Sequence, residues 1–234
     1  MKPIALIPAR AGSKRLPLKN RQMIGGKTLV QHAVDHAEAS GLFCAIAIST
    51  DDEMFFDPGD HSMADAQITQ GQTLVIRRPV ELAADDTPMM GVVQDTVDTL
   101  AKAGVDFDSI VLLQPTSPMR TADDIRAAYE LFVERRAEAV ISVVETRQPE
   151  VFTQGHAGRL RPITIHVDGR RLLVPNGAIY ILRREAMERG LDWWSAPVTY
   201  GYEMPPERSL DIDTVVDLMK AREAYDELTG QSRS

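Results

Sequence analysis

Basic side chains cluster directly after the first apolar run of the sequence. Residues 7–20 read IPARAGSKRLPLKN, and the cations among them are Arg10, Lys14, Arg15 and Lys19. Gly12 permits a backbone conformation that turns amide groups inward, and Ser13 adds a hydroxyl. A triphosphate requires this combination of fixed amides and cationic side chains. The segment therefore predicts a phosphate-binding loop, although a solvated basic loop would have a similar composition.

A second polar segment, LLQPTSPMR, covers residues 112–120. Its two prolines restrict the chain, while Gln114, Thr116 and Ser117 offer neutral donors and acceptors that suit a base or a sugar. Arg120 suits a carboxylate. The alternative is a rigid turn whose hydroxyls cap the next helix. That role is expected of Thr121, and it does not exclude a binding site beside it.

Two carboxylates alternate in the segment LDIDT, residues 210–214. On an extended backbone Asp211 and Asp213 point to the same side, while Ile212 points into the core. Paired carboxylates form a hard oxygen site of the kind that Mg²⁺ accepts, with water and phosphate oxygens as further ligands. The alternative is that Asp213 caps the following helix.

Two other patterns resemble ligand sites but lack parts of them. The run GGKT at residues 25–28 ends like a P-loop, but Arg21 stands where the first glycine is required. It is interpreted as a turn and a helix start. His32 and His36 lie one helical turn apart, but no clear third metal ligand accompanies them, so a solvated helix face is the preferred interpretation.

Alternating apolar runs and helical patterns predict an α/β fold in a single domain, residues 1–234. Strands are expected at 4–9, 44–49, 73–76, 109–113 and 139–144, and helices at 28–40, 88–103, 121–136 and 213–225. This order predicts a mostly parallel sheet with helices on both faces, whose ligands bind beyond the carboxyl ends of the strands. Residues 149–174 break the pattern and predict an inserted β-hairpin arm. Because the arm has too few apolar residues for a core of its own, a homodimer is expected to stabilise it.

Bulk composition excludes several classes of partner. The formal net charge of −8 argues against non-specific binding to nucleic acid or membranes. Cys44 is the single cysteine, which rules out an intramolecular disulfide and favours a reducing compartment. The apolar residues that follow Lys2 are too few for a signal peptide or a membrane span, so a cytoplasmic protein is expected.

Taken together, the motifs resemble those of the acylneuraminate cytidylyltransferases, also called CMP-sialic acid synthetases. The resemblance spans nearly the whole chain. It rests on five segments in order: residues 7–20, RPVELA at 78–83, residues 112–120, PNGAIY at 175–180, and residues 210–214. The segments GSK, residues 12–14, and KN, residues 19–20, of the first loop are typical of the sialic-acid branch rather than of the related Kdo enzymes.

The resemblance implies transfer of CMP from CTP to the anomeric hydroxyl of a nonulosonic acid, with release of pyrophosphate. Its implied catalytic residues are Lys19, Arg10 and Asp211. Its implied nucleotide-binding residues are Arg10, Ser13, Lys14, Lys19, Asn20, Arg78 and Thr116. Its implied sugar-binding residues are Gln114, Thr116, Ser117, Arg120 and Asn176. Asp211 and Asp213 would hold Mg²⁺, for which Mn²⁺ is a possible substitute.

One departure from the family pattern concerns the sugar. Sialic-acid enzymes commonly carry arginine before the PNG segment, where this chain has Val174. Arg170 or Arg171 could take over its role. The alternatives left open are Kdo or another acidic sugar as acceptor, and a non-catalytic nucleotide-binding relative; the presence of Lys19 and both aspartates argues against the latter.

Overall fold

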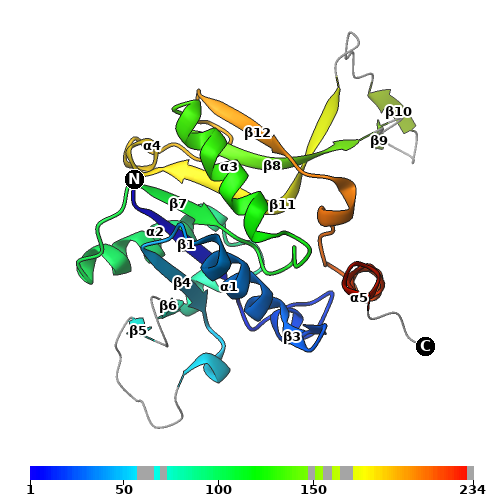
Figure 1. Ribbon diagram of the computed structural model, residues 1–234, viewed down its shortest axis with the longest axis horizontal. Coiled ribbons are helices and arrows are strands. Elements are labelled where there is room, and N and C mark those ends of the chain that lie inside the picture. The colour runs from blue at the N-terminus through cyan, green and yellow to red at the C-terminus, as the bar shows by residue number, and fades with distance from the viewer. Residues whose placement is uncertain (57–65, 69–72, 147–150, 155–159, 164–170, 231–234) are drawn as a thin grey trace.

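An eight-stranded sheet forms the centre of the protein (Figure 1). The computed structural model describes residues 1–56, 66–68, 73–146, 151–154, 160–163 and 171–230. Across the sheet the strands are β12 (Thr199–Glu203), β8 (Ala139–Thr146), β11 (Leu172–Arg183), β7 (Ser109–Leu112), β1 (Pro3–Pro8), β4 (Ala45–Thr50), β6 (Thr73–Arg77) and β5 (Ala66–Ile68).

The parallel part of the sheet confirms the predicted fold class. Strand β1 pairs in parallel with β4 and β7, β4 pairs with β6, and β12 pairs with β8. Strand β11 runs antiparallel between β7 and β8, and the edge strand β5 is antiparallel to β6. The carboxyl ends of β1, β4, β6 and β7 therefore meet at one edge, which is where the sequence places its polar loops.

Helices cover both faces of the sheet because the strand side chains alternate. In β1, Ala5 and Ile7 pack with the apolar side chains of α1 (Leu29–Ser40) and α3 (Ala122–Glu134). Ile4 and Leu6 pack on the opposite face with α2 (Met89–Lys102) and α4 (Arg184–Glu188). All four strand side chains have no exposed surface. Burial of each large aliphatic side chain stabilises the fold by about 1.5–3 kcal/mol.

Capping residues explain where the main helices begin. Thr28 accepts a hydrogen bond from the Gln31 amide at the start of α1, and Thr121 forms a capping box with Asp124 at the start of α3. The cap at Thr121 matches the sequence expectation, whereas Thr28, expected as the first residue of its helix, is the cap before it. The last helix, α5 (Val215–Thr229), begins later than predicted because its cap is Thr214.

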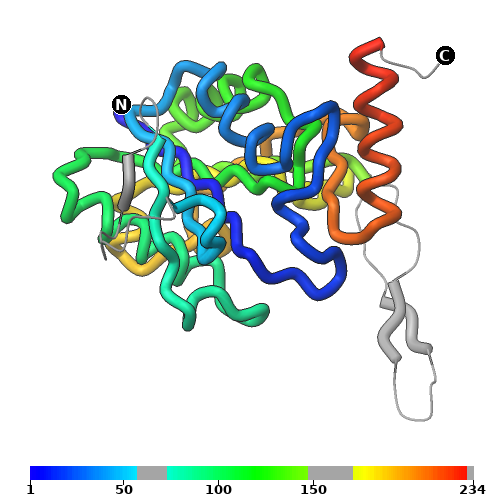
Figure 2. The backbone as a smooth tube through the Cα atoms, turned by 90° about the horizontal axis from the view of Figure 1, so that it is seen from below, coloured from blue at the N-terminus to red at the C-terminus, as the bar shows by residue number. Residues whose placement is uncertain are grey.

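Helix α5 packs away from the two main layers, at one side of the sheet beside the N-terminal loop (Figure 2). Leu218 and Ala221 of α5 share a small apolar cluster with Leu16, Ile24 and Ile212. The short strands β2 (Met23–Ile24) and β3 (Lys27–Thr28) form a hairpin beneath it. Ile212 is completely buried, as predicted for the residue between the two aspartates.

The predicted β-hairpin is present in part. Strands β9 (Val151–Gln154) and β10 (Leu160–Ile163) pair antiparallel in a separate two-stranded sheet. Residues 172–174 belong instead to β11 of the main sheet, so the arm is shorter than the predicted range of 149–174. Dimerisation through this arm stays a prediction. No helix within the described ranges is long and apolar enough to cross a membrane.

Candidate active site

The first polar pocket lies beyond the carboxyl ends of β1, β6 and β7. The structure brings most of the predicted nucleotide-binding side chains to its wall. They are Arg10, Ser13, Lys19, Asn20, Arg78 and Thr116, joined by Gln114 and Met89. Residues separated by about half the chain thus meet because parallel strands end at a common edge.

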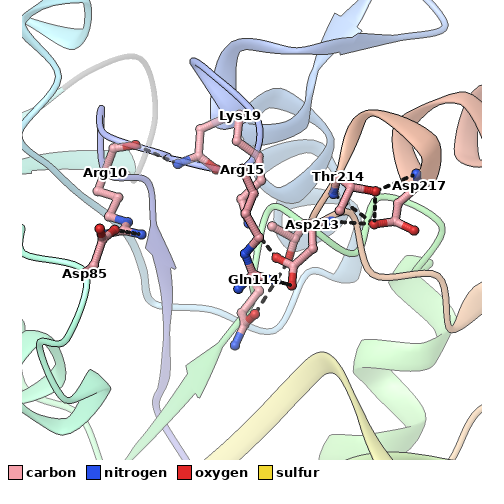
Figure 3. A network of polar contacts seen from close by, with 10 residues as sticks. Arg10, Arg15, Lys19, Asp85, Gln114, Asp213, Thr214 and Asp217 are labelled. Atoms are coloured by element: carbon pink, nitrogen blue, oxygen red, sulfur yellow. Dashed lines mark hydrogen bonds and ion pairs between the residues drawn. The ribbon is translucent and has the colours of Figure 1, made fainter.

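Arg10 and Lys14 converge on a carboxylate that the motifs do not single out. Arg10 Nη2 lies 2.7 Å from Asp85 Oδ1 (Figure 3). Lys14 Nζ lies 2.6 Å from Asp85 Oδ2. The two cations lower the pKa of Asp85. Lys14 is largely exposed and does not line the pocket, so in this structure it reaches the site only through Asp85.

Lys19 and Arg15 form a matching arrangement around Asp213. Lys19 Nζ lies 3.0 Å from Asp213 Oδ1, and Arg15 Nη1 lies 2.9 Å from Asp213 Oδ2 (Figure 3). Lys19 is only 20% exposed, whereas Arg15 is 71% exposed. Lys19 is therefore the loop cation best shielded from water, and its charge acts on a bound ligand most strongly.

Hydrogen bonds to neighbouring segments fix two further residues of this pocket, Arg78 and Asn20. Arg78 is buried and donates hydrogen bonds from Nε to the Ser49 hydroxyl, at 3.1 Å, and from Nη2 to the Ser49 carbonyl, at 2.8 Å. Desolvation lowers the pKa of Arg78 to about 10, which leaves it protonated at neutral pH. Asn20 Nδ2 donates to the Arg10 carbonyl at 2.8 Å and thereby fixes the basic loop.

A second pocket adjoins the first and shares Gln114 with it. It is lined by Gln114, Val144, Pro175, Asn176, Gly177, Tyr180, Ser209 and Asp211. Asn176 belongs to the predicted sugar site, while Tyr180 and Ser209 were not predicted as site residues. A tyrosine in a PNGAIY run could have been proposed on spacing, because it lies on the same strand, whereas Ser209 carries no such signal.

An irregularity in β11 shapes this second pocket. The register with β8 shifts between Pro175 and Tyr180, and Gly177 has a φ of 80°, in the left-handed region that favours glycine. Asn176 Oδ1 accepts a hydrogen bond from the Ser142 hydroxyl at 2.6 Å, and its Nδ2 donates to Ser209 Oγ at 2.9 Å. The displaced residues therefore have fixed side-chain positions in the pocket wall.

Asp211 extends the second pocket toward Lys19 and Asp213. Desolvation raises the pKa of the Asp211 carboxyl, as does the negative charge of Asp213, while a hydrogen bond from Thr116 and the charge of Lys19 oppose this rise. The neighbouring Ile212 amide donates to the Thr116 carbonyl at 2.8 Å, which ties this segment to the loop after β7.

The donor chemistry at Asp211 and Asp213 fits a hard divalent cation in part. The pair supplies carboxylate oxygens, but the described portion of the chain contains no group of three or more His, Cys, Asp or Glu side chains able to hold a metal. Substrate oxygens or water would have to complete the coordination. Asp213 does not cap α5, since Thr214 accepts from the Asp217 amide and closes a capping box with it. The helix-cap alternative for Asp213 is therefore wrong.

Some predicted residues lie outside both pockets. Arg120 has no exposed surface, and its Nη1 donates to the Gln114 carbonyl at 3.2 Å and to the Ala178 carbonyl at 2.8 Å. Both bonds come from Nη1, and Arg120 lines neither pocket, so its contact with a sugar carboxylate stays a prediction. Ser117 is likewise completely buried and lines neither pocket, and its place in the sugar site also stays a prediction.

Arg171, one candidate replacement for the missing sugar-site arginine, is paired with acids in this arrangement. It contacts Glu145 on β8, at 2.7 Å, and Glu203 on β12. Arg170 lies outside the described residues. His32 is buried, with Nε2 2.9 Å from the Ile24 carbonyl, which corrects the expectation of a solvated helix face.

Comparisons with known proteins agree with this geometry. A family model described as Cytidylyltransferase matches residues 4–229. The chain is 34% identical to an N-acylneuraminate cytidylyltransferase of Streptococcus agalactiae, covering 94% of this chain and 52% of that protein. It is 30% identical to a CMP-N,N'-diacetyllegionaminic acid synthase of Legionella pneumophila, covering 93% of each. The chain thus spans about half the length of the streptococcal relative and nearly all of the Legionella one.

A solved structure supports the fold. A CMP:2-keto-3-deoxy-manno-octonic acid synthetase complexed with CTP superposes with a TM-score of 0.65 at 19% identity, covering 100% of both chains. At this identity the likeness concerns the fold alone.

Proposed function

This chain belongs to the cytidylyltransferase family, and we propose that it transfers CMP from CTP to the anomeric hydroxyl of a nonulosonic sugar acid, releasing pyrophosphate. The observation that carries the proposal is the pair of pockets that meet at Gln114. A transferase must bring two substrates into contact, and one cationic and one neutral-to-acidic pocket with a shared wall suit a nucleotide and its acceptor.

The cationic pocket accounts for the nucleotide. Arg10, Ser13 and Lys19 surround the space into which the phosphates would enter, with Arg78 on the far wall. Lys14 would join them when it leaves Asp85. Neutral groups, including Gln114 and Thr116, would select the base, because charges alone do not distinguish one nucleoside triphosphate from another.

The second pocket would hold the acceptor. Asn176, Tyr180 and Ser209 supply polar groups at fixed positions for sugar hydroxyls. In the reaction the anomeric oxygen bonds to the α-phosphorus, the bond from that phosphorus to the bridging oxygen breaks, and pyrophosphate leaves with the electron pair. The hydroxyl proton passes to solvent or to a nearby base. Lys19 would stabilise the negative charge that redistributes around the α-phosphate.

A divalent cation belongs to the proposal as a partner of Asp211 and Asp213. Mg²⁺, or Mn²⁺ in its place, would supply charge neutralisation for the phosphates when bound. Asp213 pairs with Lys19 and Arg15 in this structure, and these cations would be freed for the nucleotide as the aspartates take up the metal. A homodimer in the cytoplasm completes the proposal. It is supported by the short β9–β10 hairpin, which forms a two-stranded sheet separate from the main sheet.

The decisive experiment measures pyrophosphate release with CTP, Mg²⁺ and a panel of sugar acids: N-acetylneuraminate, legionaminic acid, pseudaminic acid and Kdo. We expect turnover with at least one nonulosonic acid and none without a sugar. Replacement of CTP by ATP should abolish turnover, because a purine exceeds a pyrimidine-sized pocket. Comparable rates with ATP would contradict the cytidylyl assignment. Activity with Kdo alone would keep the chemistry and overturn the acceptor, and inactivity with all four would favour a non-catalytic relative.

A further inference from the structure

The carboxylate of Asp124 has more hydrogen bonds than a helix cap requires. Its Oδ2 accepts from the Thr121 amide at 2.9 Å and from the Thr121 hydroxyl at 2.8 Å, which completes the cap of α3. Arg208 adds a bidentate contact, in which Nε donates to Oδ2 at 2.9 Å and Nη2 donates to Oδ1 at 2.9 Å. The Tyr202 hydroxyl donates to Oδ1 at 3.1 Å.

Asp124 is charged in this environment although only 1% of it is exposed. Burial alone would raise the pKa of its carboxyl, but the hydrogen bonds from Arg208 and Thr121 outweigh burial and bring the pKa below its usual value. A buried charge is costly unless it is paired, so the contact with Arg208 is part of what makes this position tolerable.

This contact joins two chain segments that both contribute residues to the wall of the second pocket. Asp124 and Thr121 follow the loop after β7, which carries Gln114. Arg208 ends the 3₁₀ turn η5 (Pro206–Arg208), and the pocket residues Ser209 and Asp211 come directly after it.

The segment 204–213 depends on such side-chain contacts because it contains no strand or α-helix. Backbone bonds attach it at both ends: the Met204 amide donates to the Val143 carbonyl at 2.8 Å, and the Ile212 amide to the Thr116 carbonyl at 2.8 Å. Between these points, Ser209 is held by Asn176 and Arg208 by Asp124. The Arg208 guanidinium therefore contributes to the placement of Ser209 and Asp211, together with Asn176 and the two backbone bonds.

We propose that Arg208 and Asp124 are a positioning pair for the acceptor half of the active site, which fixes Ser209 and Asp211 without touching either substrate. The inference rests on the proposed function. The nucleotide pocket contains no residue from 204–213, so it should be insensitive to the pair. A displacement of even about 1 Å at a reacting site can reduce the rate by about 10²-fold.

The test compares Arg208→Met, Arg208→Lys and Asp124→Asn. Asparagine caps a helix about as well as aspartate, so Asp124→Asn preserves α3 while it removes the charge. We expect kcat/KM for the sugar acid to fall about 10²-fold in Arg208→Met, with KM for CTP within about twofold of the wild type. Arg208→Lys should recover part of the loss, because it keeps the charge but not the two-pronged geometry. The double variant Arg208→Met/Asp124→Asn should be no worse than Arg208→Met alone.

Asp123→Asn is the matched control, since Asp123 is adjacent, 86% exposed and paired on the helix surface with Arg126. It should behave as the wild type. Equal losses for CTP and the sugar acid in step with a lower melting temperature would show a purely structural role, and unchanged kinetics in Arg208→Met would also overturn the inference. If the wild type proves inactive with every sugar, the proposed function has failed by itself. The pair is then judged by hydrogen exchange, where Arg208→Met should accelerate exchange at residues 209–213 and leave α1 unchanged.

Discussion

Replacement of Lys19 by alanine tests whether the basic loop performs chemistry or only holds the nucleotide. Among the cations of the loop, Lys19 is the least exposed, at 20%. Its ammonium group faces the first pocket and lies 3.0 Å from Asp213. Its charge is therefore in position to act on the phosphorus where the two pockets meet, while Arg10, Ser13 and Arg78 remain to bind the nucleotide.

The magnitude follows from the shielding of this charge. Two unit charges about 4 Å apart interact by about 4 kcal/mol at an effective dielectric constant of about 20. Asp213 already neutralises part of the Lys19 charge, and the ground-state triphosphate receives part of the remainder. We expect about 2.7 kcal/mol to be specific to the transition state, which lowers kcat by about 10²-fold, the low end for removal of one preorganised charge contact.

The assay is steady-state pyrophosphate release with CTP varied at a saturating concentration of sugar acid. Lys19→Ala should lower kcat with little change in KM for CTP. Lys27→Ala is the matched control, because Lys27 pairs with Asp35 on the surface and should be dispensable. A raised KM for CTP with an unchanged kcat would refute the reasoning and leave Lys19 as a ground-state anchor.

Three further outcomes are expected. Asp211→Asn and Asp213→Asn should each nearly abolish turnover, with little change in melting temperature because Thr214 supplies the helix cap. A higher Mg²⁺ concentration should restore some activity in at least one of these variants. Normal activity in Asp211→Asn would contradict a metal role. Asp85→Asn should lower KM for CTP to about one third, because it removes a negative charge that competes with the phosphates for Arg10 and Lys14. A raised KM would show instead that this carboxylate orients the two cations. Desolvation lowers the pKa of His36 to about 4 in the folded protein. The free energy of unfolding should therefore fall as the pH drops from about 6.5 to about 4, by at most about 3 kcal/mol. Denaturant titrations should show a weaker dependence of this free energy on pH in His36→Gln, and an equal pH dependence would refute the reasoning.

The residues of the first pocket could be brought together from the sequence because local patterns determine where they lie. Arg10, Arg78 and Gln114 each follow a short apolar run, and parallel strands bring such positions to one edge whatever the details of packing. The helix starts were predictable for a similar reason, since a cap such as Thr121 acts within its own turn.

The composition of the second pocket depends on long-range packing that local sequence patterns do not encode. Arg120 has the residue type expected of a carboxylate ligand, but its side chain is fully buried with Nη1 bonded to two backbone carbonyls, and burial cannot be read from an isolated arginine. Tyr180 lines the second pocket because β11 pairs antiparallel with β7, and Ser209 lines it because the irregular segment 204–213 returns to the same place. Asp85 lies in an ordinary polar stretch, and its partners are about seventy residues away.

The shifted register of β11 places the second pocket at an interruption of the sheet. On either side of residues 176–179, β11 continues its ladder with β8, while Ile179 within the interruption stays buried in the core. Half of the residues that line the second pocket lie in this interruption and in the segment 204–213, whereas the first pocket is built on the parallel strands. Under the proposed function, exchange of a few of these side chains should change which sugar acid is accepted, because the walls of the nucleotide pocket lie elsewhere in the fold.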